Sequence, residues 1–546
     1  MFRLFRSHLM LSFALFFALT ACSSAPSAPS GAADTASADK PAQQEEHKAS
    51  RPIIIATTQD AQGDRLDAAS YNGSRHVHAS VYEALVDYQG GGKLAPSLAE
   101  SWEATPDGTT YTFHLRKGVQ FSDGSALTAG AVKFSLERAA ANKDTAPLEL
   151  VRKLQSIDTP DDYTVIIHFK EMASQILLEL SQARPLRIMS PNAVSPAGAV
   201  DGEFKQAIGT GPWKITSYKK DVETVLAPNE HYWREKPSTH NLVLKVITDP
   251  QARVLALQNG EADIAGGELG NIPLENLPLF ENNKDFIIEQ HPSTMSYFMV
   301  INQHQEFLAD RNVRQAINLG KDSSVLMNGQ GAEVKGLFQP SVAFVTDNNQ
   351  PFYGYHPDQA KQLLEKSGFV WNNNKQLYEK NGKELALRLV IQTEEYPEWK
   401  EMAEIFQDQM KKIGIRIDIL NQERASYYNT LWDTKEYDLL LYRTYTDAQL
   451  PYRFLSSLFY DTKETPAVAY QDKQLTEYLD QIANTISEPE QQAIFDKLFT
   501  RMHEEAMTVP MYYTRQTFVH SSKIKGFTFA SIEDDPVKWH LLTAGE

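Results

Sequence analysis

Residues 94–102 read Leu94-Ala95-Pro96-Ser97-Leu98-Ala99-Glu100-Ser101-Trp102, and the stretch continues through Pro106-Asp107-Gly108 and Tyr111-Thr112-Phe113-His114-Leu115-Arg116 to Phe121-Ser122-Asp123-Gly124. In the run 111–115, large apolar side chains alternate with polar ones, which predicts a strand with one buried face. Asp107-Gly108 supplies turn chemistry just before it, because glycine tolerates a positive φ. The stretch therefore predicts a turn that leads into a half-buried strand.

Strand and helix patterns alternate through the rest of the chain in no simple repeat. Val165-Ile166-Ile167-His168-Phe169 is a second strand-like run. His356-Pro357 begins a predicted helix that Gly368 ends. Apolar residues recur at helical spacing from Trp399 to Ile413, Gly414 ends this helix, and a strand over 415–419 follows. These patterns predict a mixed α/β protein built from several layers.

Composition narrows the functional classes. The 546 residues include one cysteine, so disulfides and thiolate metal sites cannot support the fold, and the 42% hydrophobic content must supply a buried core. The formal net charge of −17 argues against nucleic acid or an anionic membrane surface as a partner. After the N-terminal segment there is no run of about 18 apolar residues that predicts a membrane span.

The N-terminus has the pattern of an export signal. Arg3 and Arg6 precede an apolar run, Leu9 to Leu19, and the tetrad Leu19-Thr20-Ala21-Cys22 follows. This arrangement resembles a lipoprotein signal peptide over residues 1–21, cut before a lipidated Cys22. The alternative is an ordinary secretory signal with an incidental cysteine. Either one predicts that the chain leaves the cytoplasm.

Residues 22–50 are poor in large apolar side chains and rich in Ser, Ala, Pro and Gln. Such a segment cannot bury enough surface to offset its ordering entropy, so we expect a flexible tether. The first strand-like residues are Pro52-Ile53-Ile54-Ile55, and folding is predicted to begin there.

The block at 94–124 resembles the signature of the family-5 extracytoplasmic solute-binding proteins, the receptors of peptide and nickel ABC importers. Further motifs of this family follow in the family's order, so that the resemblance covers nearly all of residues 51–546. They are Gly209-Thr210-Gly211-Pro212-Trp213, Asn229-Glu230-His231-Tyr232-Trp233, Gln258-Asn259-Gly260-Glu261-Ala262-Asp263, Val313-Arg314-Gln315-Ala316-Ile317-Asn318 and Tyr355-His356-Pro357-Asp358. For most of these motifs we favour a structural role.

The resemblance implies an α/β fold of the two-lobed periplasmic-binding-protein type (type II, cluster C). The first lobe would comprise residues 51–293 and 515–546, with an extra subdomain inserted at about 94–205, and the second lobe residues 294–514. In the family the ligand lies between the lobes, and the permease recognises the form that has closed around it.

Ala183-Arg184-Pro185-Leu186-Arg187 resembles the nickel-binding branch, in which the first arginine reaches the ligand's carboxylates. A guanidinium group offers planar, bidentate donors and stays charged at physiological pH. Arg184 is therefore the leading ligand contact. Arg187 either joins it, supports the loop or pairs with an acid. The alternative is two surface arginines that flank a turn proline.

The stretch from Tyr442 to Ser457 resembles the second-lobe loop that faces the ligand, and it contributes Arg443 and Tyr445 as candidates. Family members usually carry tryptophan where Tyr445 stands, and this tyrosine could stack on a ligand or simply be a packed aromatic. Peptide binders often place an aspartate three residues later. Here that position holds Ala448, which weakens a peptide-binding interpretation.

Tyr71 and Arg75 fall in the first-lobe loop that borders the cleft in relatives, where Arg75 could be a second carboxylate clamp. His76 and His78 alternate as on a strand and are candidate metal ligands, with structural or exposed roles as the alternative. The nickel branch also supplies a histidine after the second-lobe loop, where this chain has Lys463. A metal inside a carboxylate-rich chelator therefore fits better than a bare ion.

These observations predict a monomeric lipoprotein, anchored by lipid to the cell membrane or the outer membrane. It would deliver a chelated divalent metal, nickel or a related ion, to the transmembrane subunits of an ABC permease, with no cofactor of its own. The chelator would be a carboxylate-rich metallophore or histidine. The alternative is an oligopeptide or dipeptide receptor of an ABC importer, and a lipoprotein that binds only other proteins is a third class.

An enzyme is not predicted. His503-Glu504-Glu505 begins like a zinc-protease helix but lacks the second histidine, and there is no Gly-x-Ser-x-Gly elbow.

Overall fold

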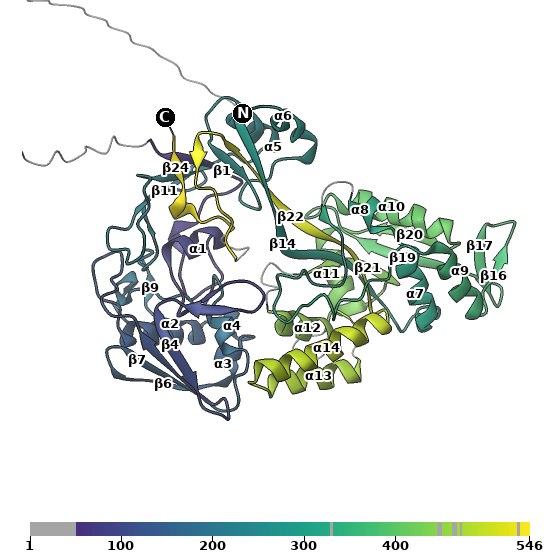
Figure 1. The fold of residues 1–546 in the computed structure, drawn as a ribbon, viewed down its shortest axis with the longest axis horizontal. Helices are drawn as coiled ribbons and strands as arrows, with labels where there is room; N and C mark the ends of the chain where they lie inside the picture. The colour runs from purple at the N-terminus through teal and green to yellow at the C-terminus, as the bar shows by residue number, and fades with distance from the viewer. Residues whose placement is uncertain are drawn as a thin grey trace, which may run out of the picture. The chain divides into compact units, whose positions relative to one another are not determined.

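Helices and strands are interspersed along the chain in the computed structural model, which describes residues 51–327, 331–444, 450–460, 467–469, 472–531 and 536–545 (Figure 1). The helices are α1 (Arg75–Val81), α2 (Ala129–Ala141), α3 (Glu149–Lys153), α4 (Ile176–Leu180), α5 (Pro250–Gln258), α6 (Pro278–Glu281), α7 (Arg311–Leu319), α8 (Ser323–Met327), α9 (Pro357–Lys366), α10 (Trp399–Lys412), α11 (Arg424–Asn429), α12 (Pro451–Phe459), α13 (Lys473–Ala483) and α14 (Glu488–Glu504).

The principal sheet runs in the order β10-β11-β12-β1-β13-β22-β14-β21-β19-β20, with β15 also paired to β22. Its strands are β1 (Ile53–Thr57), β10 (Trp213–Lys219), β11 (Glu223–Pro228), β12 (Leu242–Val246), β13 (Ile264–Gly266), β14 (Phe286–Ile301), β15 (Gly331–Ala332), β19 (Ala386–Ile391), β20 (Arg416–Asn421), β21 (Leu439–Arg443) and β22 (Thr508–Ser521). The strand-like residues predicted at 52–55 overlap the start of β1.

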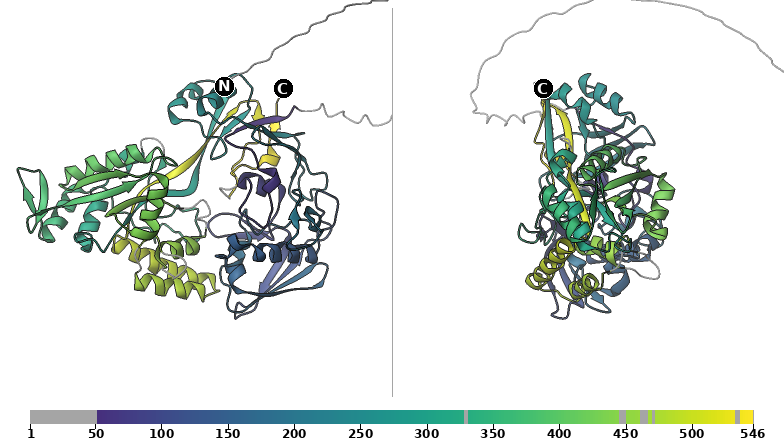
Figure 2. Two further views of the ribbon diagram at one scale, coloured as in Figure 1. Left: turned by 180° about the vertical axis from the view of Figure 1, so that it is seen from behind. Right: turned by 90° about the vertical axis from the view of Figure 1, so that its right-hand side faces the viewer.

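Two long antiparallel strands, β14 and β22, connect the two lobes of this α/β fold (Figures 1 and 2). Their pairing is continuous from Phe286 to Pro292, breaks, and resumes at Ser296 opposite Tyr513. Hydrophobic side chains on either side of this break belong to different cores. One core contains buried residues between Tyr297 and Tyr512, and two others contain residues before 289 and after 517.

A separate four-stranded sheet has the order β4-β5-β7-β6. These strands are β4 (Ala99–Ala104), β5 (Thr110–Leu115), β6 (Leu154–Asp161) and β7 (Thr164–Phe169). The alternating run 111–115 lies in β5, where Tyr111, Phe113 and Leu115 are buried. The run 165–169 lies in β7 and pairs with β5. Both predicted strands are confirmed.

Smaller strand pairs complete the structure. They are β2 (Val86–Tyr88) with β3 (Leu94–Pro96), β8 (Val194–Ser195) with β9 (Glu203–Phe204), and β23 (Ile524–Lys525) with β24 (Thr543–Ala544). A three-stranded sheet has the order β16 (Val370–Asn372), β17 (Leu377–Lys380), β18 (Lys383–Glu384). In the parts of the chain that the structure describes, no helix is both long and apolar enough to cross a bilayer.

The second lobe confirms the predicted succession of helix, glycine and strand. α10 buries Trp399, Met402 and Phe406 and ends at Lys412, and Gly414 has a φ of +78°. A Cβ at Gly414 would lie 2.5 Å from the Trp371 ring, so glycine is required both by the backbone and by the space. β20 then pairs parallel with β19.

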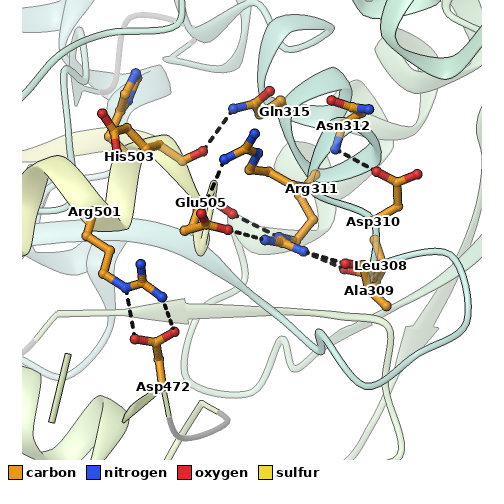
Figure 3. A network of polar contacts seen from close by, with 12 residues as sticks. Leu308, Ala309, Asp310, Arg311, Asn312, Gln315, Asp472, Arg501, His503 and Glu505 are labelled. Atoms are coloured by element: carbon orange, nitrogen blue, oxygen red, sulfur yellow. Dashed lines mark hydrogen bonds and ion pairs between the residues drawn. The ribbon is translucent and has the colours of Figure 1, made fainter. Parts of the chain in front are cut away.

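The motif 313–318 has a structural role in the second lobe. Arg314 is 3% exposed, and its Nη1 donates to the carbonyl oxygens of Leu308 (3.0 Å) and Ala309 (3.1 Å). Its Nε donates to the Glu505 carbonyl oxygen at 2.9 Å, and its Nη2 lies 3.3 Å from the Glu505 carboxylate. Arg311 reaches the same carboxylate from the surface (Figure 3). Arg314 therefore fastens α7 to the end of α14.

Candidate functional site

Arg184 and Tyr71, which are 113 residues apart, lie together in the first lobe. The Arg184 Nη1 donates hydrogen bonds to the carbonyl oxygens of Tyr71 and Gly73, the latter at 3.0 Å. The guanidinium carbon lies 6.0 Å from the centroid of the Tyr71 ring. Gly73 has a φ of +79°, and a Cβ there would lie 2.7 Å from Leu66. Glycine thus allows the loop to turn its carbonyl groups toward Arg184.

Arg75 begins α1, and its guanidinium forms an ion pair with the Glu268 carboxylate in the loop after β13. The structure thus gives this predicted clamp residue an acidic partner within the protein. Arg187 is 5% exposed and donates from Nε to the Gln182 carbonyl oxygen at 2.7 Å. This contact corresponds to the loop-supporting role that was one of its expected roles.

His76 and His78 lie in helix α1, so the expectation that they alternate on a strand is wrong. Residues two apart on a helix point to different faces, and the pair cannot share one. Val77 and Val81 are buried and lie four residues apart, a spacing that indicates a helix. The alternating histidines in the same segment indicate a strand instead, and that pattern is misleading here.

His78 is fully buried and acts within the loop. Its Nε2 lies 3.0 Å from the Asn72 carbonyl oxygen, and burial lowers the pKa of this imidazole to about 3, with the charges of Arg184 and Arg187 adding to the shift. It is therefore a neutral histidine that holds the Tyr71 loop. Among the described residues, no three His, Cys, Asp or Glu side chains converge as a metal site.

Arg443 lies on β21 in the second lobe. Its Nε donates to the Tyr396 hydroxyl, its guanidinium carbon lies 5.3 Å from the Tyr396 ring centroid, and its Nη1 donates to the Thr444 carbonyl oxygen. Tyr396 stacks on Trp399 of α10 at 4.3 Å. Arg443 thus joins the aromatic cluster beside α10. The predicted residues Tyr445 and Cys22 lie outside the described residues.

Arg453 was not predicted from the sequence, and it contacts the same tyrosine as Arg184. Its Nη2 donates to the Tyr71 hydroxyl at 3.2 Å, across a separation of 382 residues. Arg453 lies in the first turn of α12, where the helix dipole disfavours a positive charge. An arginine in the first turn of a helix does not stabilise that helix, so its presence is a sequence signal that Arg453 has another role.

A cavity of about 370 Å³ lies beside α1 in the first lobe, and Arg187, Glu83 and Arg234 are among its lining residues. The Glu83 carboxylate accepts a hydrogen bond from the Trp233 indole at 2.8 Å. Burial raises the pKa of Glu83 to about 7, although Arg234 acts in the opposite direction. Glu83 is not among the residues predicted from the sequence, where its only signal is an acid inside the apolar run 81–85.

Comparison with known proteins gives one family and several relatives. Residues 93–466 match the model of the bacterial extracellular solute-binding proteins, family 5. The chain is 30% identical over 467 residues to the nickel-binding periplasmic protein of Escherichia coli K12, which covers 84% of this chain and 88% of that protein. It is 27% identical over 436 residues to the di/tripeptide-binding protein 2 of Pseudomonas aeruginosa UCBPP-PA14, covering 74% and 79%.

Among solved structures, the chain resembles NikA of Brucella suis in complex with Fe(III)-EDTA. The TM-score is 0.81 and the sequence identity 28%, with 90% of this chain and 100% of that chain covered. The Escherichia coli and Pseudomonas aeruginosa relatives are binding proteins by name.

Proposed function

The chain belongs to the family-5 bacterial extracellular solute-binding proteins, the substrate-binding partners of ABC permeases, and on this premise we propose that it captures a divalent metal inside a carboxylate-rich chelator. Nickel or a related ion is the proposed metal. A metallophore with several carboxylates or a histidine complex is the proposed chelator.

The observation that carries the proposal is the packing of Arg184 against the loop 71–73, to which it is hydrogen-bonded. Its Nη1 donates hydrogen bonds to two backbone carbonyl oxygens, those of Tyr71 and Gly73. These two bonds fix the guanidinium plane beside the Tyr71 ring. A guanidinium group fixed in this way is suited to bidentate recognition of a carboxylate. The relatives that bind nickel and Fe(III)-EDTA support a metal carried by such an anion.

We further propose that the lobes have the boundaries 51–293 with 515–546 and 294–514, with the insert at about 94–205. The separate hydrophobic cores on the two sides of residues 293–296 and 513–517 support this division. The break in β14–β22 pairing at Pro292 to Ser296 would allow the lobes to rotate as the ligand binds.

Cys22 is proposed to carry a lipid that keeps the receptor at the membrane, with residues 23–50 as the tether. Replacing Cys22 with serine should release the protein from the membrane fraction into the soluble fraction. Retention of the serine variant in the membrane fraction would contradict the anchor.

The decisive experiment is native mass spectrometry of the protein purified from its own growth medium, combined with metal analysis. A bound species whose mass equals a metal plus an organic anion would support the proposal. A bound peptide with no metal would overturn it in favour of a peptide receptor, the alternative that the Pseudomonas relative supports.

A further inference from the structure

We propose that Arg453 is a second ligand-binding arginine, contributed by the second lobe, and that the preferred ligand carries at least two carboxylates. This inference rests on the proposed function, because it concerns the same site and names the class of chelate that the site prefers. It assigns a residue of the stretch 442–457 that was not among the candidates drawn from that stretch, which were Arg443 and Tyr445.

The two arginines meet at Tyr71 from different lobes. Arg184, in the first lobe, lies beside the backbone and the ring of Tyr71. Arg453, in the second lobe, reaches the hydroxyl of the same side chain. Because Arg453 and Tyr71 belong to different lobes, both guanidinium groups lie where the first-lobe loop approaches the second lobe.

The start of α12 is fixed by packing in both lobes. Phe454 lies 5.6 Å from Phe338, measured between ring centroids, within the second-lobe core. Leu450, directly before the helix, is buried against Tyr88 and Leu178 of the first lobe. Arg453 therefore extends from a backbone whose position is set by the contact between the lobes.

A ligand carboxylate would be a stronger acceptor for Arg453 than the Tyr71 hydroxyl is. The hydroxyl is neutral, and charge-assisted hydrogen bonds to a carboxylate are about twice as strong. The positive charge of Arg453 also acts on the Glu179 carboxyl. That carboxylate already accepts the backbone N–H groups of Glu149 at 2.8 Å and Leu150 at 3.0 Å.

One arginine in each lobe favours a ligand that carries more than one carboxylate. A single carboxylate can be held bidentately by one guanidinium group, so it satisfies one lobe. A second carboxylate on the same chelate would contact the other lobe and bind preferentially to the closed form. The number of carboxylates should then decide how much Arg453 contributes to affinity.

The test is calorimetric titration of the full mature chain with three probes. Fe(III)-EDTA and Ni²⁺-EDTA offer four carboxylates, and the one-to-one complex of Ni²⁺ with ethylenediamine-N-acetate offers one. The variants are Arg453→Ala and Arg453→Gln, of which the second keeps a donor for the Tyr71 hydroxyl. Arg184→Ala is the comparison, and Arg416→Ala, which removes an exposed second-lobe arginine on β20, is the control.

We expect both Arg453 variants to weaken binding of the EDTA complexes by about ten- to a hundredfold and binding of the monocarboxylate complex by less than about threefold. Two results would reject the ligand-binding role of Arg453 and leave the proposed function intact. One is an equal loss of affinity for all three probes, and the other is an unchanged affinity for the EDTA complexes while Arg184→Ala weakens them. If the wild-type chain binds none of the probes, the proposed function fails as well.

Discussion

Glu149 and Glu179 each cap the helix that carries the other. The Glu179 carboxylate on α4 accepts hydrogen bonds from the first two backbone N–H groups of α3, those of Glu149 and Leu150. The Glu149 carboxylate accepts from the N–H of Gln175, directly before α4, at 2.6 Å. Lys153 Nζ lies 2.9 Å from Glu149 and partly balances the two charges. The pair therefore joins two short helices at the point where the first lobe faces α12.

Stability should fall as pH rises through the titration of this pair. Burial raises the pKa of Glu179 from about 4.5 to about 7, with the Glu149 charge adding to the shift. Between these values the folded chain binds more protons than the unfolded chain, so the free energy of unfolding decreases with increasing pH. We expect a loss of about 2 to 3 kcal/mol from Glu179 between pH 5 and pH 8, measured by urea unfolding.

The matched variant is Glu179→Gln, which cannot titrate and should show a shallower decrease over this range. Glu83, whose pKa is also raised to about 7 by burial, contributes in the same direction, and Glu83→Gln separates its share. Identical pH profiles for wild type and Glu179→Gln would contradict the assignment.

Local periodicity explains which parts of the fold could be predicted. The strand at 165–169, the helix that ends before Gly368 and the helix that ends before Gly414 all carry their signal within a few turns of chain. α1 was misread because it is only seven residues long and has just two buried valines to mark its helical face. Alternating histidines then suggested the wrong period.

The site was predictable only in part, because its contacts join distant residues. Arg184 and Tyr71 were selected through a family resemblance, and no spacing in the sequence indicates that they meet. The Arg453–Tyr71 contact and the mutual capping by Glu149 and Glu179 depend on the packing of α12, α3 and α4. Such relationships arise from tertiary structure, which hydrophobic periodicity does not encode.

Arg314→Ala should destabilise the second lobe by about 3 kcal/mol, because it leaves the Glu505 carboxylate and three carbonyl oxygens without their buried donor. The control is Arg311→Ala on the same helix, whose side chain is 55% exposed and contacts the same carboxylate. It should cost less than about 1 kcal/mol. Urea unfolding of both variants measures the difference, and equal effects would show that burial of Arg314 is not what stabilises the junction.

Gly414→Ala should destabilise the chain by roughly 2 to 4 kcal/mol, since it combines a left-handed backbone with overlap against Trp371 and Tyr378. Gly382 offers a matched control. It has a φ of +76°, but a Cβ there would have no neighbour within 4 Å. Gly382→Ala should therefore show only the backbone cost of about 1 to 2 kcal/mol. If the two variants unfold at the same urea concentration, the space around Gly414 has no energetic role.

Arg184→Ala should reduce the affinity for a carboxylate chelate by roughly 1.5 to 3 kcal/mol, the value of a hydrogen bond to a charged group. Arg184→Lys keeps the positive charge but loses the planar fork and the fixed contacts with the Tyr71 and Gly73 carbonyl oxygens, so we expect an intermediate affinity. Calorimetric titration with Fe(III)-EDTA measures both variants, and thermal unfolding shows whether the Tyr71 loop has lost stability. A lysine variant that binds as tightly as wild type would mean that charge alone is recognised. Unchanged binding by the alanine variant would remove Arg184 from the site.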